Sequence, residues 1–281
     1  MTYPYNSQIF LGEVALYVEN IENMTYFYHQ VLGLDILEKK ETEVLLGVDG
    51  EGLVRLLVAT QAKSRTYGLY HLALLVPTRQ DLANVFKRLA EARIPMVGGA
   101  DHGYSEAIYL EDPERNGIEI YHDKDVAVWD IREDGRIVGV TEELAAQDLY
   151  DSGVYTEPFE LPSGTRMGHV HLSVKDSQSA SAFYQTLLGL EDKFSMPSAS
   201  WLASGDYHHH LAVNEWDSKL AGKCQKGQAG LAYFTVFVKD KEDLVAVHER
   251  ARELGITPNW LHSRMLEIRD VDGIRVRVAL K

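Results

Sequence analysis

The strongest constraint on the fold is a long repeat. The segment LGEVALYVENIENMTYFYHQVLGLDI at 11–36 recurs at 167–192 as MGHVHLSVKDSQSASAFYQTLLGLED. In both copies apolar residues first alternate and then follow a helical spacing that ends at glycine, the usual residue just past a helix C-terminus. Each copy therefore predicts a strand, a turn and an amphipathic helix, and the repeat indicates duplicated structural units.

A weaker repeat relates residues 71–95 to residues 233–257, and each of the four copies is followed by short alternating runs. The chain is therefore predicted to contain four modules of strand, helix and three strands. Because one such module leaves a sheet face uncovered, modules must pair to enclose a core or a site. The predicted division is an N-terminal domain with modules one and two at 1–125, a connector at 126–165, and a C-terminal domain with modules three and four at 166–281.

Composition narrows the class of function. The 281 residues carry a formal charge of −14 and no basic run, so we expect neither a nucleic-acid partner nor a membrane surface, but small molecules. The single cysteine, Cys224, cannot form an intramolecular disulfide. The N-terminus lacks the pattern of a signal peptide, and no apolar run reaches the length of a membrane span. A cytoplasmic protein is expected.

Two further motifs carry a family resemblance: the helix end in FYHQVLGL and the turn and strand in DPERNGIEIY. With the βαβββ repeat they resemble the vicinal oxygen chelate superfamily of glyoxalases, bleomycin resistance proteins and extradiol dioxygenases. The likeness covers all four modules and is greatest for type I extradiol ring-cleaving enzymes of the catechol 2,3-dioxygenase kind. It implies an α+β fold in which paired modules curl mixed sheets around a metal. Arg115 departs from the family pattern, in which this turn usually carries a glycine.

The resemblance implies metal ligands on the first strand of a module and at a glutamate of the last strand. Read in this way, His71, Glu119 and His169 form a set of two histidines and one carboxylate, which suits Fe(II), with Mn(II) as the alternative. His171 is expected on the opposite face of its strand. In module four, Tyr233 and Arg275 stand at the ligand positions and cannot replace a ligand histidine and glutamate, and Arg275 would repel a cation.

The third ligand depends on which modules pair. If modules one and two share a cavity, Glu13 joins His71 and Glu119 in a set closer to glyoxalase sites. If modules two and three do, His169 is the third ligand. We favour His169, because GHVHLSV resembles a ligand strand of the family more closely than GEVALYV does.

The same resemblance implies catalytic residues. In GDYHHHLAVN, His209 precedes the apolar run at the spacing of the family's acid–base histidine, and strand alternation is expected to turn His208 and His210 away. Tyr109 stands ten residues before Glu119, as does the family's active-site tyrosine. The other expected site residues are His102 as a further histidine of the site, and Asn214 and Trp216 closing the pocket.

The predicted activity is ring opening of a catechol-type aromatic diol with O2, and the resemblance also implies a homo-oligomer. Two alternatives share the scaffold: a glyoxalase-like metal-dependent lyase or isomerase, and a non-catalytic binding protein resembling bleomycin resistance proteins. Fold likeness alone does not separate these. The features that favour the dioxygenase are His209, Tyr109 and His102, which the alternatives do not need.

Overall fold

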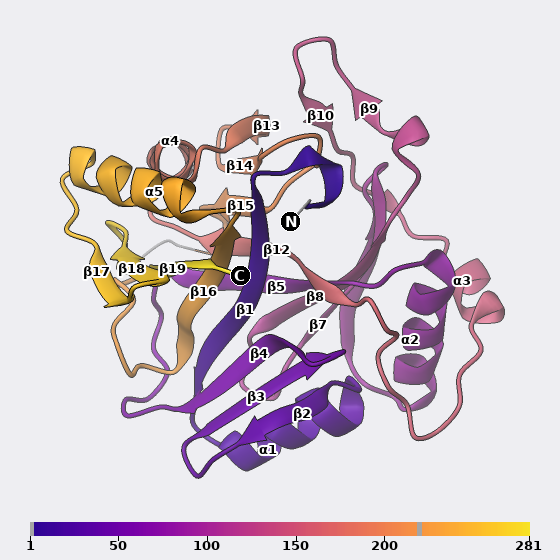
Figure 1. Ribbon diagram of the computed structural model, residues 1–281. Coiled ribbons are helices and arrows are strands. Elements are labelled where there is room, and N and C mark those ends of the chain that lie inside the picture. Colours follow the sequence, from indigo (N-terminus) through magenta and orange to yellow (C-terminus); the bar gives the residue numbers. More distant parts are fainter. Residues whose placement is uncertain (1–2, 218–220) are drawn as a thin grey trace.

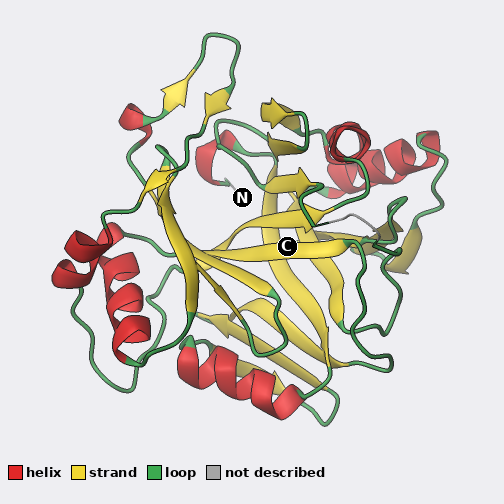
Figure 2. Ribbon diagram, turned by 180° about the vertical axis from the view of Figure 1, so that it is seen from behind, coloured by secondary structure: helices red, strands yellow, loops and turns green. Residues whose placement is uncertain are grey.

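The computed structural model describes residues 3–217 and 221–281, which form two large curled sheets of mixed strand direction. Strands occupy the middle of the molecule and helices lie at its periphery (Figure 2). This is the predicted α+β class, with four βαβββ modules. No helix in the described part of the chain is long and apolar enough to cross a membrane.

Each module follows the predicted order of strand, helix and three strands (Figure 1). Module one consists of β1 (Ile9–Val18), α1 (Ile21–Tyr26) with the π-helical turn Phe27–Val31, β2 (Asp35–Lys39), β3 (Glu43–Val48) and β4 (Glu51–Val58). Module two consists of β5 (Gly68–Leu75), α2 (Arg79–Glu91), β6 (Met96–Asp101), β7 (Ser105–Glu111) and β8 (Gly117–Asp123). Module three consists of β12 (Arg166–Ser173), α4 (Ser177–Leu188), β13 (Glu191–Met196), β14 (Ala199–Ala203) and β15 (Leu211–Asn214). Module four consists of β16 (Gly230–Val238), α5 (Lys241–Glu253), β17 (Asn259–His262), β18 (Met265–Arg269) and β19 (Arg275–Leu280).

The helices begin where the sequence supplies a capping side chain. Thr78 accepts a hydrogen bond from the amide of Asp81, whose carboxylate accepts from the Thr78 amide, and this capping box starts α2. Asp176 caps α4 in the same position, and that helix ends at Gly189 with φ of 69°. A capping side chain satisfies amides that the first helical turn leaves unpaired. The helices therefore start at the repeat's turn residues, and their apolar faces cover the sheets.

The modules pair across the two halves of the chain. The nine-stranded sheet joins module two to module three through antiparallel β5 and β12, and the eight-stranded sheet joins module one to module four through antiparallel β1 and β16. The sheets thus cut across the predicted division at 1–125 and 166–281, since each contains one module from each half. The physical reason is that the first strand of every module is an edge that must be paired. The strand's own sequence does not identify which other edge it pairs with.

Two equivalent hydrogen bonds tie together the modules that are adjacent in sequence. The hydroxyl of Tyr28 in module one donates to buried Asp112 in module two at 3.0 Å, and Tyr184 in module three donates to Asp270 in module four at 2.9 Å. Both tyrosines belong to the FY pair of the repeat. Each half of the chain is therefore held by a helix-to-turn contact, while the sheets join the halves to each other.

The connector is more ordered than its sequence suggests. It contains the short helix Val126–Val128, the hairpin of β9 (Asp130–Ile131) and β10 (Ile137–Val138), β11 (Glu142–Glu143) and α3 (Ala146–Ser152). Strand β11 pairs with β6 and so extends the nine-stranded sheet. This pairing places residues 139–141 against the cavity described next.

Candidate metal centre

Three neighbouring strands place the predicted ligands on one face of the nine-stranded sheet. Ala73 on β5 pairs with Glu119 on β8 and with His169 on β12, so these residues form one row across the sheet. His71 precedes Ala73 by two positions and therefore points to the same face. In this row the small side chain of Ala73 stands between Glu119 and His169.

The ligand atoms converge. His71 Nε2 lies 3.0 Å from Glu119 Oε2 and 3.2 Å from His169 Nε2, and His169 Nε2 lies 3.2 Å from the same carboxylate oxygen. In the described part of the chain this is the one group of three or more such side chains arranged to hold a metal ion. All three residues are buried. Two imidazole nitrogens and one carboxylate are a donor set that fits a divalent iron or manganese ion and leaves other coordination positions open.

The protonation states suit metal binding. Burial lowers the pKa of His169 to about 4, although Glu119 opposes this shift, so its ring is neutral at neutral pH. Burial would raise the pKa of Glu119, but His169 and His71 outweigh burial and hold that pKa well below its usual range. Neutral imidazole and ionised carboxylate are the forms that bind a cation.

A cavity of about 470 Å³ opens over this group. Its wall contains every predicted catalytic and metal-binding residue, namely His71, Glu119, His169, His102, Tyr109 and His209. The same lining includes the apolar and aromatic side chains of Phe194, Met196, Trp201 and Trp216. Residues 139–141 of the connector complete the lining. A volume of this size accommodates a small organic molecule.

Tyr109 and His102 form a hydrogen-bonded chain at the cavity. Nδ1 of His102 bonds the carbonyl oxygen of Val140 at 2.8 Å, so this nitrogen carries the proton. In the neutral ring Nε2 then accepts a hydrogen bond from the Tyr109 hydroxyl at 2.6 Å. Burial and the carboxylate of Glu119 raise the pKa of Tyr109 well above its usual value, so the hydroxyl stays protonated. The connector thereby orients a residue of module two toward the cavity.

The three consecutive histidines take three different environments, and strand alternation does not produce them. They precede β15, which begins at Leu211. His209 lines the cavity, and its ring lies 4.1 Å from that of His169. His208 contacts Asp123, while His210 lies beside Ser7 and Ser204. All three rings are buried, so none of them is a solvated strand end.

One prediction about the strand faces is wrong. His171 lines the same cavity as His169, because residues two apart on a strand share a face. Its Nε2 pairs with the side-chain nitrogen of Asn214 at 2.8 Å, and Tyr70 and Trp216 pack around its ring. Trp216 lines the pocket as expected. Asn214 is not among the lining residues, and its side chain contacts His171 instead. Period-two counting from His169 is the signal that could have found His171.

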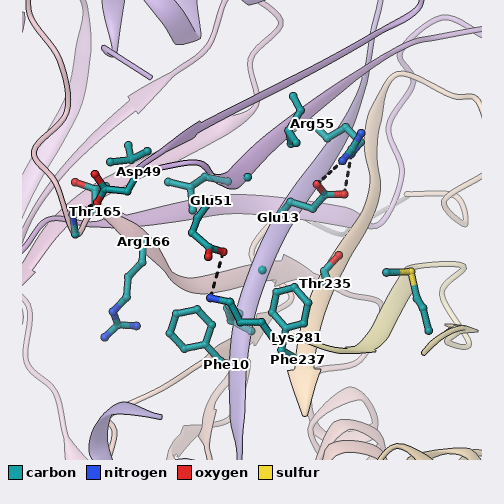
Figure 3. A pocket seen from close by; sticks show the side chains of 18 residues that line it. Phe10, Glu13, Asp49, Glu51, Arg55, Thr165, Arg166, Thr235, Phe237 and Lys281 are labelled. Atoms are coloured by element: carbon teal, nitrogen blue, oxygen red, sulfur yellow. Dashed lines mark hydrogen bonds and ion pairs between the residues drawn. The ribbon is translucent and has the colours of Figure 1, made fainter. Parts of the chain in front are cut away.

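The eight-stranded sheet has an equivalent concave face with a different chemistry. A cavity of about 410 Å³ lies there, and Figure 3 shows Arg55 and Glu13 facing each other at its wall. Arg55 donates two hydrogen bonds to the Glu13 carboxylate, at 2.8 and 2.9 Å, and the Tyr233 hydroxyl donates a third at 2.6 Å. Glu13 is therefore separate from the His71 group and already neutralised by a cation.

Module four also lacks ligands, but the residue responsible is not the expected one. The register pairs Thr235 with Arg277, as it pairs Ala73 with Glu119, so Arg277 and not Arg275 takes the place of the glutamate. The Arg277 guanidinium lies 3.5 Å from the centre of the Tyr233 ring and is paired with Glu267. A guanidinium at this position repels a metal cation.

These features agree with the comparisons with known proteins. The family model described as the Glyoxalase/Bleomycin resistance protein/Dioxygenase superfamily matches residues 10–120 and 166–278. The chain belongs to this superfamily. The family resemblance of the sequence is thereby confirmed, and the two matched stretches are the two halves on either side of the connector.

Relatives of the chain include proteins named as dioxygenases. A Bacillus subtilis (strain 168) protein named catechol-2,3-dioxygenase is 34% identical over 253 residues, which cover 87% of this chain and 88% of that protein. Biphenyl-2,3-diol 1,2-dioxygenase 3 of Rhodococcus globerulus is 27% identical over 125 residues, 40% of this chain and 63% of that protein. The crystal structure of glyoxalase I from Zea mays shares the fold, with a TM-score of 0.60 at 15% identity, covering 97% of this chain and 92% of that one.

Proposed function

We propose that this protein is a metal-dependent extradiol dioxygenase that opens the ring of a catechol-type aromatic diol with O2. The observation that supports this most is the cavity over His71, Glu119 and His169, in which the three ligands, a neutral histidine and a tyrosine hydroxyl face an aromatic wall. The likeness to a catechol-2,3-dioxygenase over nearly the whole chain supports the same activity.

The proposed ligands are His71, Glu119 and His169, and the proposed ion is Fe(II), with Mn(II) as the alternative. The bound ion would supply Lewis acidity toward the diol and one-electron chemistry toward O2. The single carboxylate leaves a divalent ion with net positive charge, which favours binding of an anionic diol oxygen. The low pKa values of Glu119 and His169 keep these two side chains ready to bind the ion at neutral pH.

We assign the role of acid and base to His209. Burial and the neighbouring histidines lower its pKa well below the usual value, so at neutral pH the ring is neutral and can accept a proton from a diol hydroxyl. The same ring can return that proton later in the turnover. Tyr109, whose own proton is directed at His102, presents oxygen lone pairs toward the cavity and can orient a substrate hydroxyl.

The aromatic wall selects for a flat ring. Trp201 and Trp216 line the cavity from module three, and their rings offer stacking partners for an aromatic substrate. Water has few polar partners beside these rings, so a planar apolar ring can displace it at low cost. The cavity therefore suits one substituted aromatic ring with two adjacent hydroxyls.

The test is anaerobic reconstitution of the purified chain with Fe(II), followed by measurement of O2 uptake with catechol and substituted catechols. We expect about one ion per chain, O2 consumption, and a coloured ring-fission product. The Glu119→Gln protein is the matched control, since it removes one ligand charge with little change in volume. A preference for zinc or nickel, with no O2 uptake on any catechol, would contradict the proposal and favour a glyoxalase-like reaction.

A further inference from the structure

The cavity histidine His209 is the terminal member of a hydrogen-bonded chain that leads away from the cavity. Its Nδ1 lies 2.7 Å from Nδ1 of His208, and Nε2 of His208 lies 2.8 Å from Oδ1 of Asp123. We propose that Asp123 is a positioning residue: acting through His208, it fixes the tautomer of His209 so that the bare Nε2 faces the cavity. This inference rests on the proposed function only for its kinetic consequence.

Asp123 is an acceptor for several donors at once. Besides His208, the hydroxyl of Tyr5 donates to its Oδ2 at 3.0 Å, and Tyr207 donates to its Oδ1 at 3.4 Å. Burial raises the pKa of Asp123, but His208, Arg166 and Tyr5 outweigh burial, and the net pKa is lowered. The carboxylate is therefore ionised at neutral pH, and an ionised carboxylate can only accept hydrogen bonds.

The positions of the protons follow from this. Nε2 of His208 must donate to Asp123, so in the neutral ring Nδ1 of His208 carries a lone pair. Because the two Nδ1 atoms are 2.7 Å apart, one of them must carry a hydrogen, and it is the one on His209. Nε2 of His209 is then unprotonated and is the nitrogen left for the cavity.

The surroundings of His208 hold its ring in one orientation. Tyr104 stacks on it with ring centres 4.2 Å apart and an angle of 12° between the planes, and Tyr207 lies 4.1 Å away. Trp129 of the connector packs at 5.2 Å. Rotating the ring by 180° about χ2 would exchange both nitrogens for carbons and break both hydrogen bonds. Packing and hydrogen bonding therefore specify the same orientation.

The three consecutive histidines thus have distinct parts. His209 faces the cavity. His208 connects it to Asp123, because its Nε2 bonds Asp123 and its Nδ1 bonds His209. In the other tautomer, His209 would direct an N–H at the cavity and could not accept a proton from a diol. A wrong tautomer should lower kcat by about 10²-fold or more and leave KM nearly unchanged, since it affects proton transfer and not binding.

The direct test is nitrogen-15 NMR of the histidine side chains in the full-length, metal-free protein, with circular dichroism to confirm the fold. The signals that disappear in the His209→Gln protein are assigned to the His209 ring. We expect His209 to be protonated at Nδ1 in the wild type. A wild-type His209 protonated at Nε2, or a His208 protonated at both nitrogens, would overturn the inference.

Two substitutions of His208 separate the two hydrogen bonds. His208→Asn places an amide oxygen near the position of Nδ1, so it keeps the acceptor for His209. His208→Gln reaches the position of Nε2 and keeps the donor to Asp123, but it loses that acceptor. We expect Asn to preserve the His209 tautomer and most of kcat, and Gln to change both. Equal behaviour of the two variants would exclude a role for the acceptor.

The outcomes distinguish this inference from the proposed function. If no catechol supports O2 uptake, the proposed function fails, while the tautomer of His209 and its response to His208→Gln remain measurable by NMR. If O2 uptake occurs but His209 carries its proton on Nε2, the inference fails and the proposed function stands. Asp123→Asn adds a further arm, in which the fraction of His209 protonated at Nδ1 should fall.

Discussion

Arg55 occupies in the eight-stranded sheet the place that Glu119 occupies in the nine-stranded sheet. Each lies on the last strand of its module and pairs with an alanine on the first strand, Ala15 for Arg55 and Ala73 for Glu119. In both modules that alanine follows the candidate ligand position by two residues. The exchange of a carboxylate for a guanidinium turns a cation-binding face into an internal ion pair. The two sheets share a fold, and this exchange of charge, together with Glu13 and Tyr233 in place of the ligand histidines, gives them different chemistry.

This difference leads to a prediction for metal binding. Glu119→Gln should weaken binding of a divalent ion by at least about 100-fold. Removing a ligand should lower the affinity at least as much as removing a hydrogen bond made to a ligand. Glu13→Gln, the same substitution at the glutamate of the other sheet, should leave the affinity unaltered. Metal content after dialysis and calorimetric titration measure both. An equal loss in the two proteins would show that the metal is bound elsewhere.

His209 should be needed for turnover but not for retention of the metal. His209→Gln removes the ring that faces the cavity, so kcat should fall by about 10²-fold or more, while the metal content stays near that of the wild type. His210→Gln is the matched control, because His210 is equally buried and lies away from the cavity, beside Ser7 and Ser204. A turnover defect confined to His210→Gln would contradict the assignment.

Arg115 stands in the turn between β7 and β8 with φ of 62°, in the left-handed region that favours glycine. The turn itself is intact, because the carboxylate of Asp112 accepts from the amides of Glu114 and Asn116. Arg115→Gly should relieve the backbone strain and raise stability by about 0.5–1 kcal/mol, a shift in Tm of about 1–2 °C.

The control for that experiment is Arg132→Gly, a substitution in the connector at an arginine without positive φ. It should lower the Tm slightly, because glycine gains freedom in the unfolded chain without relieving strain in the folded one. Thermal unfolding followed by circular dichroism measures both variants. A lower Tm for Arg115→Gly would mean that its ion pair with Glu111 outweighs the strain.

Asp270 should make stability depend on pH. Burial raises its pKa to about 6 in the folded protein, against about 3.9 in an unfolded chain. The stability contributed by this proton is therefore complete below pH 4 and is lost as the pH rises through 6. The difference of about two units corresponds to about 3 kcal/mol.

The comparison with Asp270→Asn isolates this effect from other titrating groups. The difference in unfolding free energy between wild type and variant should change by that amount between pH 4 and pH 7, with the wild type losing stability relative to the variant. Urea unfolding at a series of pH values gives the measurement. A constant difference across this range would show that Asp270 keeps an ordinary pKa in the folded state.

Much of the site could be predicted because the repeat assigns equivalent positions to distant residues. His71 and His169 are 98 residues apart, yet both stand near the middle of a module's first strand, so one family pattern identifies both. The pairing of modules could not be predicted in the same way. Whether β5 pairs with β1 or with β12 depends on edge-to-edge contacts, and all four first strands have the same alternating pattern.

Local irregularities account for the remaining differences. The histidines at 208–210 precede their strand, so the direction of each ring depends on partners such as Asp123 and not on alternation. The sequence indicated Arg275 at the position of the glutamate, whereas the structure places Arg277 there. The difference depends on the register between β19 and β16, which only the paired strands reveal. The connector's part in holding His102 through Val140 has no sequence signature, since a backbone carbonyl forms the contact.

The pairing of β1 with β16 has a consequence for how the chain is made. Phe10 on β1 pairs with Phe237 on β16, so β1 lacks this neighbour until more than 220 further residues have been synthesised. Contacts this distant in sequence slow folding, and an unpaired apolar edge invites association with other chains meanwhile. Completion of the eight-stranded sheet is therefore a late step of folding, which has to wait until module four has been synthesised.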